Sequence, residues 1–207
     1  RQCRPDLPLI GFQVLAFLWL ALAQGNPNRR CWYLLSGLAS LWAIMTKEMV
    51  GLVPLGSAVG YFLLRRQWKE LFHTAFLGAI VLAIGPVAGW VWLEKALYHD
   101  TLWKNYFQQS VAFFMQAEHL RQPGWYYGWA ILDKYWYLLP LALVGAWIAL
   151  RKIFKGEEPR WGMILLWAIA LPVGFTLAKH KVHYYILPSY AAAALLVGLA
   201  LDRWIRP

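Results

Sequence analysis

Charged residues are scarce in this 207-residue sequence: Asp, Glu, Lys and Arg together make up 14% of it. A soluble globular domain carries about 25% charged residues. Hydrophobic residues, by contrast, make up 60% of the chain, and 17% of it is aromatic. Because so little polar side-chain surface is available to cover a globule of this size, the composition excludes a water-soluble domain. It indicates a protein that lies largely within a lipid bilayer.

Cysteine is also rare, and the motifs of several common sites are missing. The two cysteines, Cys3 and Cys31, fall on opposite sides of the membrane in the topology derived below, so we do not expect them to pair with each other. The sequence contains no P-loop, no Gly-x-Ser-x-Gly elbow, no Cys-x-x-Cys pair, no arginine ladder and no selectivity-filter motif. These absences exclude P-loop nucleotide hydrolases, serine hydrolases of the elbow type and voltage-gated channels.

Apolar residues are concentrated in long blocks, of which four cover 7–23, 71–93, 161–178 and 184–201. A helix needs about 20 mainly apolar residues, with a range of roughly 17–25, to cross the hydrocarbon core. We therefore predict an all-α fold, with 1–207 forming a single polytopic transmembrane domain. Its predicted segments, about seven, are 7–23, 32–46, 49–64, 71–93, 135–150, 161–178 and 184–202. The second and third are short and close together, so they could also form one broken or re-entrant element.

The connections between these segments alternate between two sides and differ in positive charge. One side holds 9 Lys and Arg in 54 residues, and the other holds 11 in 29 residues. Short loops rich in Lys and Arg stay in the cytoplasm. We therefore expect the second side to be cytoplasmic, and we attribute the net charge of +10 to topology and lipid head-group contact rather than to nucleic acid binding. The outward side comprises 1–6, 47–48, 94–134 and 179–183, and the cytoplasmic side 24–31, 65–70, 151–160 and 203–207.

The long connection 94–134 contains an amphipathic pattern. Trp103, Phe107, Val111 and Phe114 follow one another at spacings of four, four and three, and polar residues lie between them. This periodicity predicts a helix over 102–118 that lies in the outer membrane interface, and the Pro-Gly pair that follows ends it.

The densest polar cluster is the predicted turn 179–188, which carries two lysines, two histidines and two tyrosines between two spans. One interpretation is a belt of cations and aromatic side chains at the membrane surface. The other is an anion site, in which a lysine meets a phosphate charge and tyrosine hydroxyls meet its oxygens. His180 and His183 could touch a metal, but the sequence offers no third ligand, so we predict no metal site.

Three further polar clusters lie at the ends of predicted segments. Residues 119–127 combine imidazole, amide and aromatic side chains, which suit either an interface anchor or a sugar or isoprenoid ligand. Lys47 and Glu48 lie between two apolar segments, either as a mutual ion pair or as functional groups. Asp6, at the entry to the first span, could be a helix N-cap.

These four clusters occur in the order of similar motifs in one family. The chain resembles the GT-C membrane glycosyltransferases related to dolichyl-phosphate-mannose protein mannosyltransferases, and most closely their lipid A aminoarabinose transferase branch. Residues 1–9 resemble the family's R-x-x-x-D-x-x-L stretch, and residues 35–47 its "GL…LTKG" stretch, with Glu48 where Gly is usual. Residues 119–127 resemble its H-x-x-x-P-x-x-Y-Y stretch, and residues 181–188 its "KLPxYILP" stretch, which is the most specific of the four.

The resemblance implies an inverting glycosyltransferase in the bacterial inner membrane, with its site facing the periplasm or exterior. Such enzymes move a sugar from a polyprenyl-phosphate carrier to an acceptor, which could be lipid A, a protein or another glycan. No cofactor is implied, and a divalent metal is left open. The family's catalytic Asp lies in the first external loop, N-terminal to everything here. We therefore expect this chain to be the C-terminal part of a longer enzyme, inactive by itself.

The resemblance also implies roles for particular residues. Because donor and acceptor are both held in the membrane, the site must lie at its surface, and cations must stabilise the negative charge that develops on the leaving lipid phosphate. The implied donor-phosphate and substrate contacts are Lys47, His119, Tyr127, Lys181 and Tyr185, with a supporting acidic role for Asp6.

The main alternative is a transporter or flippase for lipid-linked glycans, and a purely structural membrane subunit is a third reading. A transporter predicts polar groups spread through the midplane and weak internal symmetry. The polar groups here gather on one side, which favours the transferase. Its expected partners are a polyprenyl-phosphate-linked sugar and membrane lipid, and not nucleic acid.

Overall fold

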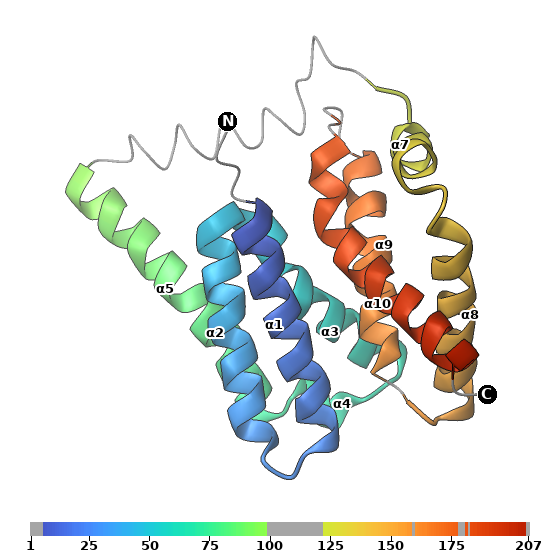
Figure 1. The fold of residues 1–207 in the computed structure, drawn as a ribbon. Helices are drawn as coiled ribbons and strands as arrows, with labels where there is room; N and C mark the ends of the chain where they lie inside the picture. Colours follow the sequence, from blue (N-terminus) through green and yellow to red (C-terminus); the bar gives the residue numbers. More distant parts are fainter. Residues whose placement is uncertain (1–5, 99–121, 159, 178–180, 182, 206–207) are drawn as a thin grey trace.

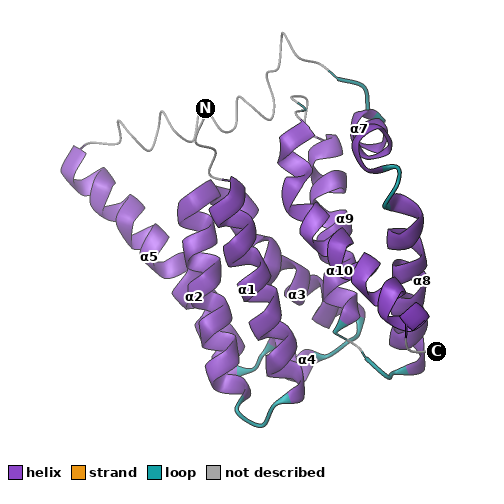
Figure 2. Cartoon of the chain, in the orientation of Figure 1, coloured by secondary structure: helices purple, strands orange, loops and turns teal. Residues whose placement is uncertain are grey.

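In the computed structural model, the regular structure of the described residues is entirely helical, and no strand occurs among them (Figures 1 and 2). The structure describes residues 6–98, 122–158, 160–177, 181 and 183–205, and for residues 48, 49, 98, 183 and 184 it describes the backbone alone. The predicted all-α class is confirmed. The elements in chain order are α1 (Asp6–Gly25), α2 (Arg29–Lys47), η1 (Glu48–Leu52), α3 (Val53–Leu64), α4 (Trp68–Leu71), α5 (Thr74–Tyr98), α7 (Tyr126–Tyr135), α8 (Leu139–Lys155), α9 (Trp161–Leu177), η2 (His183–Ile186) and α10 (Leu187–Ile205).

Seven of these helices correspond to the seven predicted segments: α1, α2, α3, α5, α8, α9 and α10. By length and apolar composition, α1 and residues Thr74–Leu97 of α5 can each cross a bilayer, and the bent pair α7 and α8 would count as a third span. Residues Val50–Leu64 and Trp161–Leu177 are apolar but shorter. A 17-residue helix such as α9 rises about 26 Å, slightly less than the roughly 30 Å hydrocarbon core, which a bilayer accommodates by local thinning.

The two short predicted segments at 32–46 and 49–64 are separate helices joined by η1. At Gly51 an added Cβ would collide with the backbone of Ala43 and Ile44, so only glycine lets η1 fold back this closely against α2. Pro54 lies in the first turn of α3, where its missing N–H leaves no helical hydrogen bond unmade. Two nearby residues therefore explain the break between α2 and α3: Gly51 permits the close approach to α2, and Pro54 is compatible with the first turn of α3.

The helix predicted over 135–150 begins and ends a few residues later in the structure, and a second, short helix precedes it. The apolar helix is α8, which begins at Leu139 and ends at Lys155, and the next residue, Gly156, has a φ of 76°, the left-handed conformation that favours glycine at a helix end. The short helix α7 precedes it and was not predicted, and the two axes differ by 111°. The helix predicted over 102–118 lies outside the described residues.

The helices form two groups with α3 between them: α1, α2 and α5 on one side, and α8, α9 and α10 on the other (Figure 1). The main core cluster joins the groups, because Phe17 of α1 stacks on Trp167 of α9 with ring centroids 4.2 Å apart. Within each group glycines permit close approach. Gly37 of α2 lies against Ala79 of α5, and Gly145 of α8 lies against the backbone of α10. Small residues at such interfaces are typical of membrane helix bundles.

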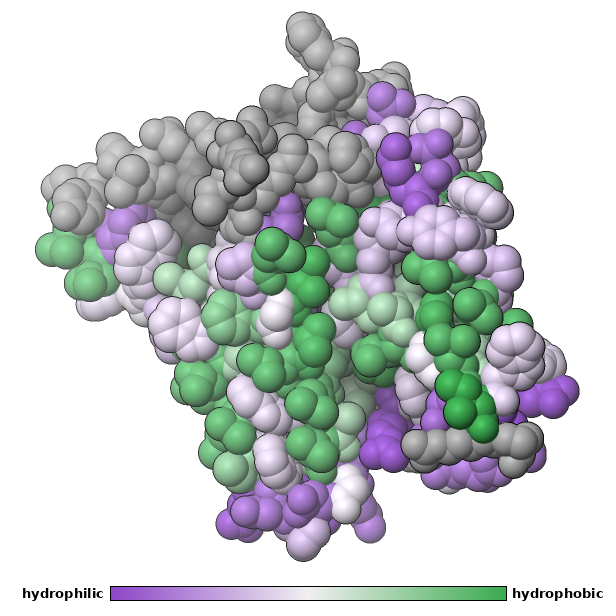
Figure 3. Space-filling model, in the orientation of Figure 1, coloured by the Kyte–Doolittle hydropathy of each residue, from purple (hydrophilic) through white to green (hydrophobic). Residues whose placement is uncertain are grey.

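Large apolar side chains cover the outside of the helices as well as filling the inside. On α8, Leu143 is 61% exposed and Trp147 is 57% exposed. In Figure 3 the green, hydrophobic surface covers the helices, while purple, hydrophilic side chains gather toward the ends of the molecule. Soluble monomers do not expose apolar surface on this scale. The chain is therefore an integral membrane domain whose apolar faces contact lipid.

The loops lie at two ends of the bundle (Figure 1). One end contains the start of α1, the end of α2 at Lys47, and η2. We call it the Asp6 end. The opposite end, with the α1–α2 connection, α4 and the α8–α9 turn, is the Arg29 end. The predicted alternation of connections between two sides is confirmed for the described residues.

Candidate functional site

An ion pair at the Asp6 end joins the first residue of α1 to the last residue of α2. Lys47 Nζ lies 2.5 Å from Asp6 Oδ1, and the two side chains are 20% and 8% exposed. The pairing arises because α1 and α2 are antiparallel neighbours, so the start of one meets the end of the other. Asp6 therefore pairs with Lys47 in addition to opening α1. The side chain of Glu48, the other partner considered for Lys47, lies outside the described residues.

Tyr185, on η2, lies beside this pair. Lys47 Nζ is 5.3 Å from the centroid of the Tyr185 ring, a cation–π distance, and the ring stacks on Phe175 of α9 with centroids 4.9 Å apart. Three of the predicted site residues, Asp6, Lys47 and Tyr185, are therefore brought together from parts of the chain up to about 180 residues apart.

The position of Lys47 is also fixed from inside the bundle, by a residue that sequence reasoning missed. Gln13 of α1 is fully buried, and its Nε2 donates a hydrogen bond to the Val50 carbonyl at 2.6 Å. This bond ties η1, and with it the end of α2, to α1. The available signal was a lone amide within an apolar span, since polar groups inside membrane helices are costly unless they have a partner.

Lys181 and Tyr127 form the second part of the site. Lys181 is only 8% exposed, and its Nζ donates to the Gln122 carbonyl at 3.2 Å. Tyr127 of α7 is 1% exposed and packs in one apolar cluster with Leu171, Phe175 and Ile186. Val50 and Tyr185 pack against the same cluster. The segments carrying Lys47 and Lys181 therefore meet at one apolar cluster at the Asp6 end.

One predicted site residue, His119, lies outside the described residues. Of the two histidines considered as metal ligands, His180 is also outside them, and for His183 the backbone alone is described. Among the described residues, no group of three or more His, Cys, Asp and Glu could hold a metal. What the described geometry offers is two partly shielded ammonium groups and tyrosine side chains at one end of the bundle, an arrangement that suits an anion carried by an apolar molecule.

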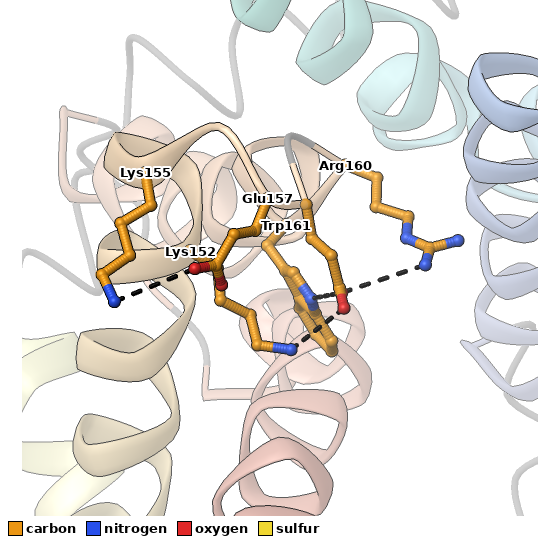
Figure 4. A network of polar contacts seen from close by, with 6 residues as sticks. Lys152, Lys155, Glu157, Arg160 and Trp161 are labelled. Atoms are coloured by element: carbon orange, nitrogen blue, oxygen red, sulfur yellow. Dashed lines mark hydrogen bonds and ion pairs between the residues drawn. The ribbon is translucent and has the colours of Figure 1, made fainter.

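At the Arg29 end, several cations form ion pairs with carboxylates that tie neighbouring helix ends together. Glu158 accepts from Lys152 Nζ at 3.0 Å and from Trp161 Nε1 at 2.6 Å, and Arg160 lies 3.9 Å away (Figure 4). The hydrogen bond from Lys152, followed by that from Trp161, lowers the pKa of Glu158 below its ordinary value. This network closes the α8–α9 turn and is structural.

A second carboxylate, that of Glu70, links the start of α2 to α4. Glu70 accepts from Arg29 at 2.8 Å and from the Tyr33 hydroxyl at 2.9 Å. The two networks hold helix ends together at the Arg29 end, so we assign them a structural role. The candidate site is therefore at the Asp6 end.

The fold is that of the GT-C membrane glycosyltransferases. The crystal structure of ArnT from Cupriavidus metallidurans bound to undecaprenyl phosphate superposes on 96% of this chain with a TM-score of 0.74 and 25% sequence identity, and this chain covers 37% of that one. The resemblance found in the sequence is thereby confirmed.

Two proteins named undecaprenyl phosphate-alpha-4-amino-4-deoxy-L-arabinose arabinosyl transferase are similar in sequence. That of Pseudomonas paraeruginosa is 32% identical over 201 residues, covering 93% of this chain and 35% of the relative. That of Aeromonas hydrophila is 34% identical over 180 residues, covering 80% of this chain and 30% of the relative. No family model matches the chain. The chain thus spans about a third of the length of the curated relatives it matches.

Proposed function

We propose that this chain is part of a glycosyltransferase that moves a sugar from an undecaprenyl-phosphate-linked donor to an acceptor at the membrane surface. The two sequence relatives carry this type of donor in their names, and the structural neighbour ArnT from Cupriavidus metallidurans was crystallised with undecaprenyl phosphate. The single observation that carries the proposal is the position of two lysines at one end of the bundle beside one apolar cluster. Lys47 lies over the ring of Tyr185, which packs against the cluster that contains Tyr127, and Lys181 binds the Gln122 carbonyl, five residues before Tyr127.

The chemistry requires such an arrangement. When the sugar leaves its carrier, negative charge develops on the lipid phosphate, and preorganised cations at that point lower the barrier. In this proposal Lys181 and Lys47 stabilise the phosphate, and Tyr185 lies beside them. Their low exposure strengthens the effect, because charges interact more strongly where water is excluded. Asp6 positions Lys47, His119 contacts the substrate, and Tyr127, which is 1% exposed, supports the site from the apolar cluster beside it. The carboxylate that deprotonates the acceptor is expected upstream of this chain.

The site is proposed to face the periplasm of a bacterial inner membrane. The Arg29 end holds the denser positive charge, with 11 Lys and Arg in 29 residues of short loops, and such loops remain cytoplasmic. The Asp6 end then faces outward, where donor and acceptor meet.

A transporter of lipid-linked glycans is the second candidate, and the placement of charge disfavours it. The charged residues of the described helices lie at or near helix ends. The buried Ser36, Ser40 and Ser57, at small-residue positions within helices, fit close helix packing rather than a solute path.

Reconstitution of the full-length protein distinguishes the two. Proteoliposomes containing undecaprenyl-phosphate-linked aminoarabinose and lipid A are analysed by mass spectrometry. A transferase yields free undecaprenyl phosphate and a glycosylated acceptor. A flippase moves the donor across the bilayer with its sugar–phosphate bond intact, and that outcome would overturn the proposal.

A further inference from the structure

Helix α7 presents a stripe of large apolar side chains that nothing in the described part of the chain covers. Trp125, Trp129, Leu132 and Trp136 are 66%, 55%, 54% and 68% exposed. They follow one another at spacings of four, three and four. At about 100° per residue these four positions fall within roughly 60° of one another around the helix, so they form one face.

The opposite face of α7 is packed on the bundle. Tyr127 is 1% exposed and Ala130 is 5% exposed, and Ile131 packs against the cluster that contains Leu171 and Ile186. The outward stripe and the packed residues of this helix are therefore both apolar, and its exposed charged pair, Asp133 and Lys134, lies in the last turn. A short surface helix in water would carry polar residues on its outward face.

The orientation of α7 differs from that of its neighbours. Its axis makes an angle of 111° with that of α8, to which it is joined through Trp136–Leu138. In Figure 1 α7 is viewed nearly along its axis, whereas α8 below it runs down the page. Since α8 runs through the apolar part of the bundle from one end to the other, α7 lies close to the plane of the membrane at the Asp6 end.

We infer that the exposed face of α7 is embedded in the boundary between head groups and acyl chains of the leaflet at the Asp6 end. Trp is enriched at this depth, where the ring lies among apolar chains and the N–H reaches polar groups. The face is also continuous along the chain with the lipid-facing surface of α8, where Leu143, Val144 and Trp147 are 51–61% exposed. Because the two surfaces are continuous, the same lipid environment can cover both, and this favours lipid over a protein partner on α7.

This placement has a consequence for the candidate site. The Gln122 carbonyl that accepts from Lys181 lies four residues before α7, and Tyr127 of α7 lies in the apolar cluster beside the site. A helix seated in the interface thus holds Lys181 near the depth of lipid phosphate groups. That consequence rests on the proposed function, whereas the seating of α7 does not.

Spin labelling of the full-length protein tests the inference. In a cysteine-free background, single cysteines at Trp129→Cys and Leu132→Cys on α7, and at Leu143→Cys and Trp147→Cys on α8, are labelled and reconstituted in phosphatidylethanolamine–phosphatidylglycerol vesicles. Accessibility to oxygen and to a water-soluble nickel complex then gives the depth of each label. Labels 129 and 132 should both lie at head-group depth and differ little. Labels 143 and 147 should be deeper and differ from each other by about 6 Å, the rise of four helical residues.

Two results would overturn the inference. High nickel and low oxygen accessibility at 129 and 132 would place the face in water. Low accessibility to both reagents would mean that protein covers it. Leu132→Cys keeps every Trp of the stripe, so it reports on the face even where Trp129→Cys weakens folding. Labels at the expected depths, together with no transfer activity in the unmodified full-length protein, would count against the proposed function and leave the seating of α7 intact.

Discussion

At the scale of single residues, the Asp6–Lys47 pair decides how the candidate site is built. Removing one member of a buried ion pair leaves the other charge uncompensated, which costs about 3–5 kcal/mol. The pair is 8% and 20% exposed, so solvent screening reduces but does not remove this effect. The sequence predicted Asp6, Lys47, Lys181 and Tyr185 as site residues, and the structure brings three of them into contact. It could not predict that Asp6 is the partner of Lys47, because that depends on how two helices pack across 41 residues of chain.

Asp6→Asn should therefore lower transfer activity by about tenfold or more, because Lys47 loses the carboxylate that positions it. The measurement is a double-mutant cycle with Lys47→Gln in the full-length enzyme. The double variant should lose less activity than the sum of the single losses, in free energy, because both remove the same interaction. Asp133→Asn is the matched control, since its pair with Lys134 is exposed and should be near-neutral. Strict additivity of Asp6→Asn and Lys47→Gln would show that the pair does not act as a unit.

At the scale of elements, close helix contacts and the turns between helices hold the site in place. Gly145 lies so near the α10 backbone at Leu196 that an added Cβ would have to displace a helix.

Helix α7, which was not predicted, shows why the sequence alone was insufficient for the elements around the site. It is ten residues long, too short to be stable by itself, and it forms because one face packs on the bundle. The sequence indicated the break at η1, because the charged residues Lys47 and Glu48 interrupt two apolar segments. It did not reveal the hydrogen bond from Gln13 to Val50 that holds η1 in place, because the two residues are 37 positions apart.

Gly145→Ala should destabilise the protein by about 1–3 kcal/mol or more, the usual effect of adding volume to a well-packed interface. Unfolding in mixed micelles with increasing sodium dodecyl sulfate measures this. Gly198→Ala on α10 is the matched control, because a Cβ there meets nothing within 4 Å and alanine favours the helix. Equal stability of the two variants would refute the close α8–α10 contact.

The α8–α9 turn should respond to pH through Glu158. Its pKa is lowered in the folded state by Lys152 and Trp161, so the network stabilises the fold above the ordinary carboxyl value of 4.5 and loses this effect as pH falls through the folded-state pKa. Glu158→Gln should lower the melting temperature in detergent at pH 7, and the difference from wild type should shrink as the pH falls below 4.5 and through the lowered pKa of Glu158. Glu157→Gln, at a looser and more exposed pair, should change little at any pH. A difference for Glu158→Gln that is independent of pH would exclude this account.

At the scale of the whole molecule, alternating apolar blocks and loop charge were enough to predict a bundle with two chemically distinct ends. They were enough because bilayer thickness sets helix length and loop charge sets orientation, and neither depends on packing detail. Which side chains meet at the Asp6 end does depend on packing, and it emerged only from the structure.

Orientation can be measured in intact cells. A cysteine at Lys134→Cys, at the Asp6 end, should react readily with a membrane-impermeant maleimide, because the side chain is 64% exposed and faces outward. A cysteine at Lys155→Cys, 69% exposed at the Arg29 end, should react only after permeabilisation. The reverse pattern would invert the topology and place the candidate site in the cytoplasm.

The central claim is that Lys181 stabilises the phosphate of a lipid-linked sugar donor. The most direct measurement compares Lys181→Ala with Lys134→Ala in the full-length enzyme, using purified undecaprenyl-phosphate-linked donor and following release of undecaprenyl phosphate. Loss of one preorganised stabiliser typically costs on the order of 10²–10³ in rate. Lys181→Ala should therefore nearly abolish transfer, Lys181→Arg should recover part of it, and Lys134→Ala should stay close to wild type. Near-wild-type activity of correctly inserted Lys181→Ala, or equal losses in both alanine variants, would contradict the account.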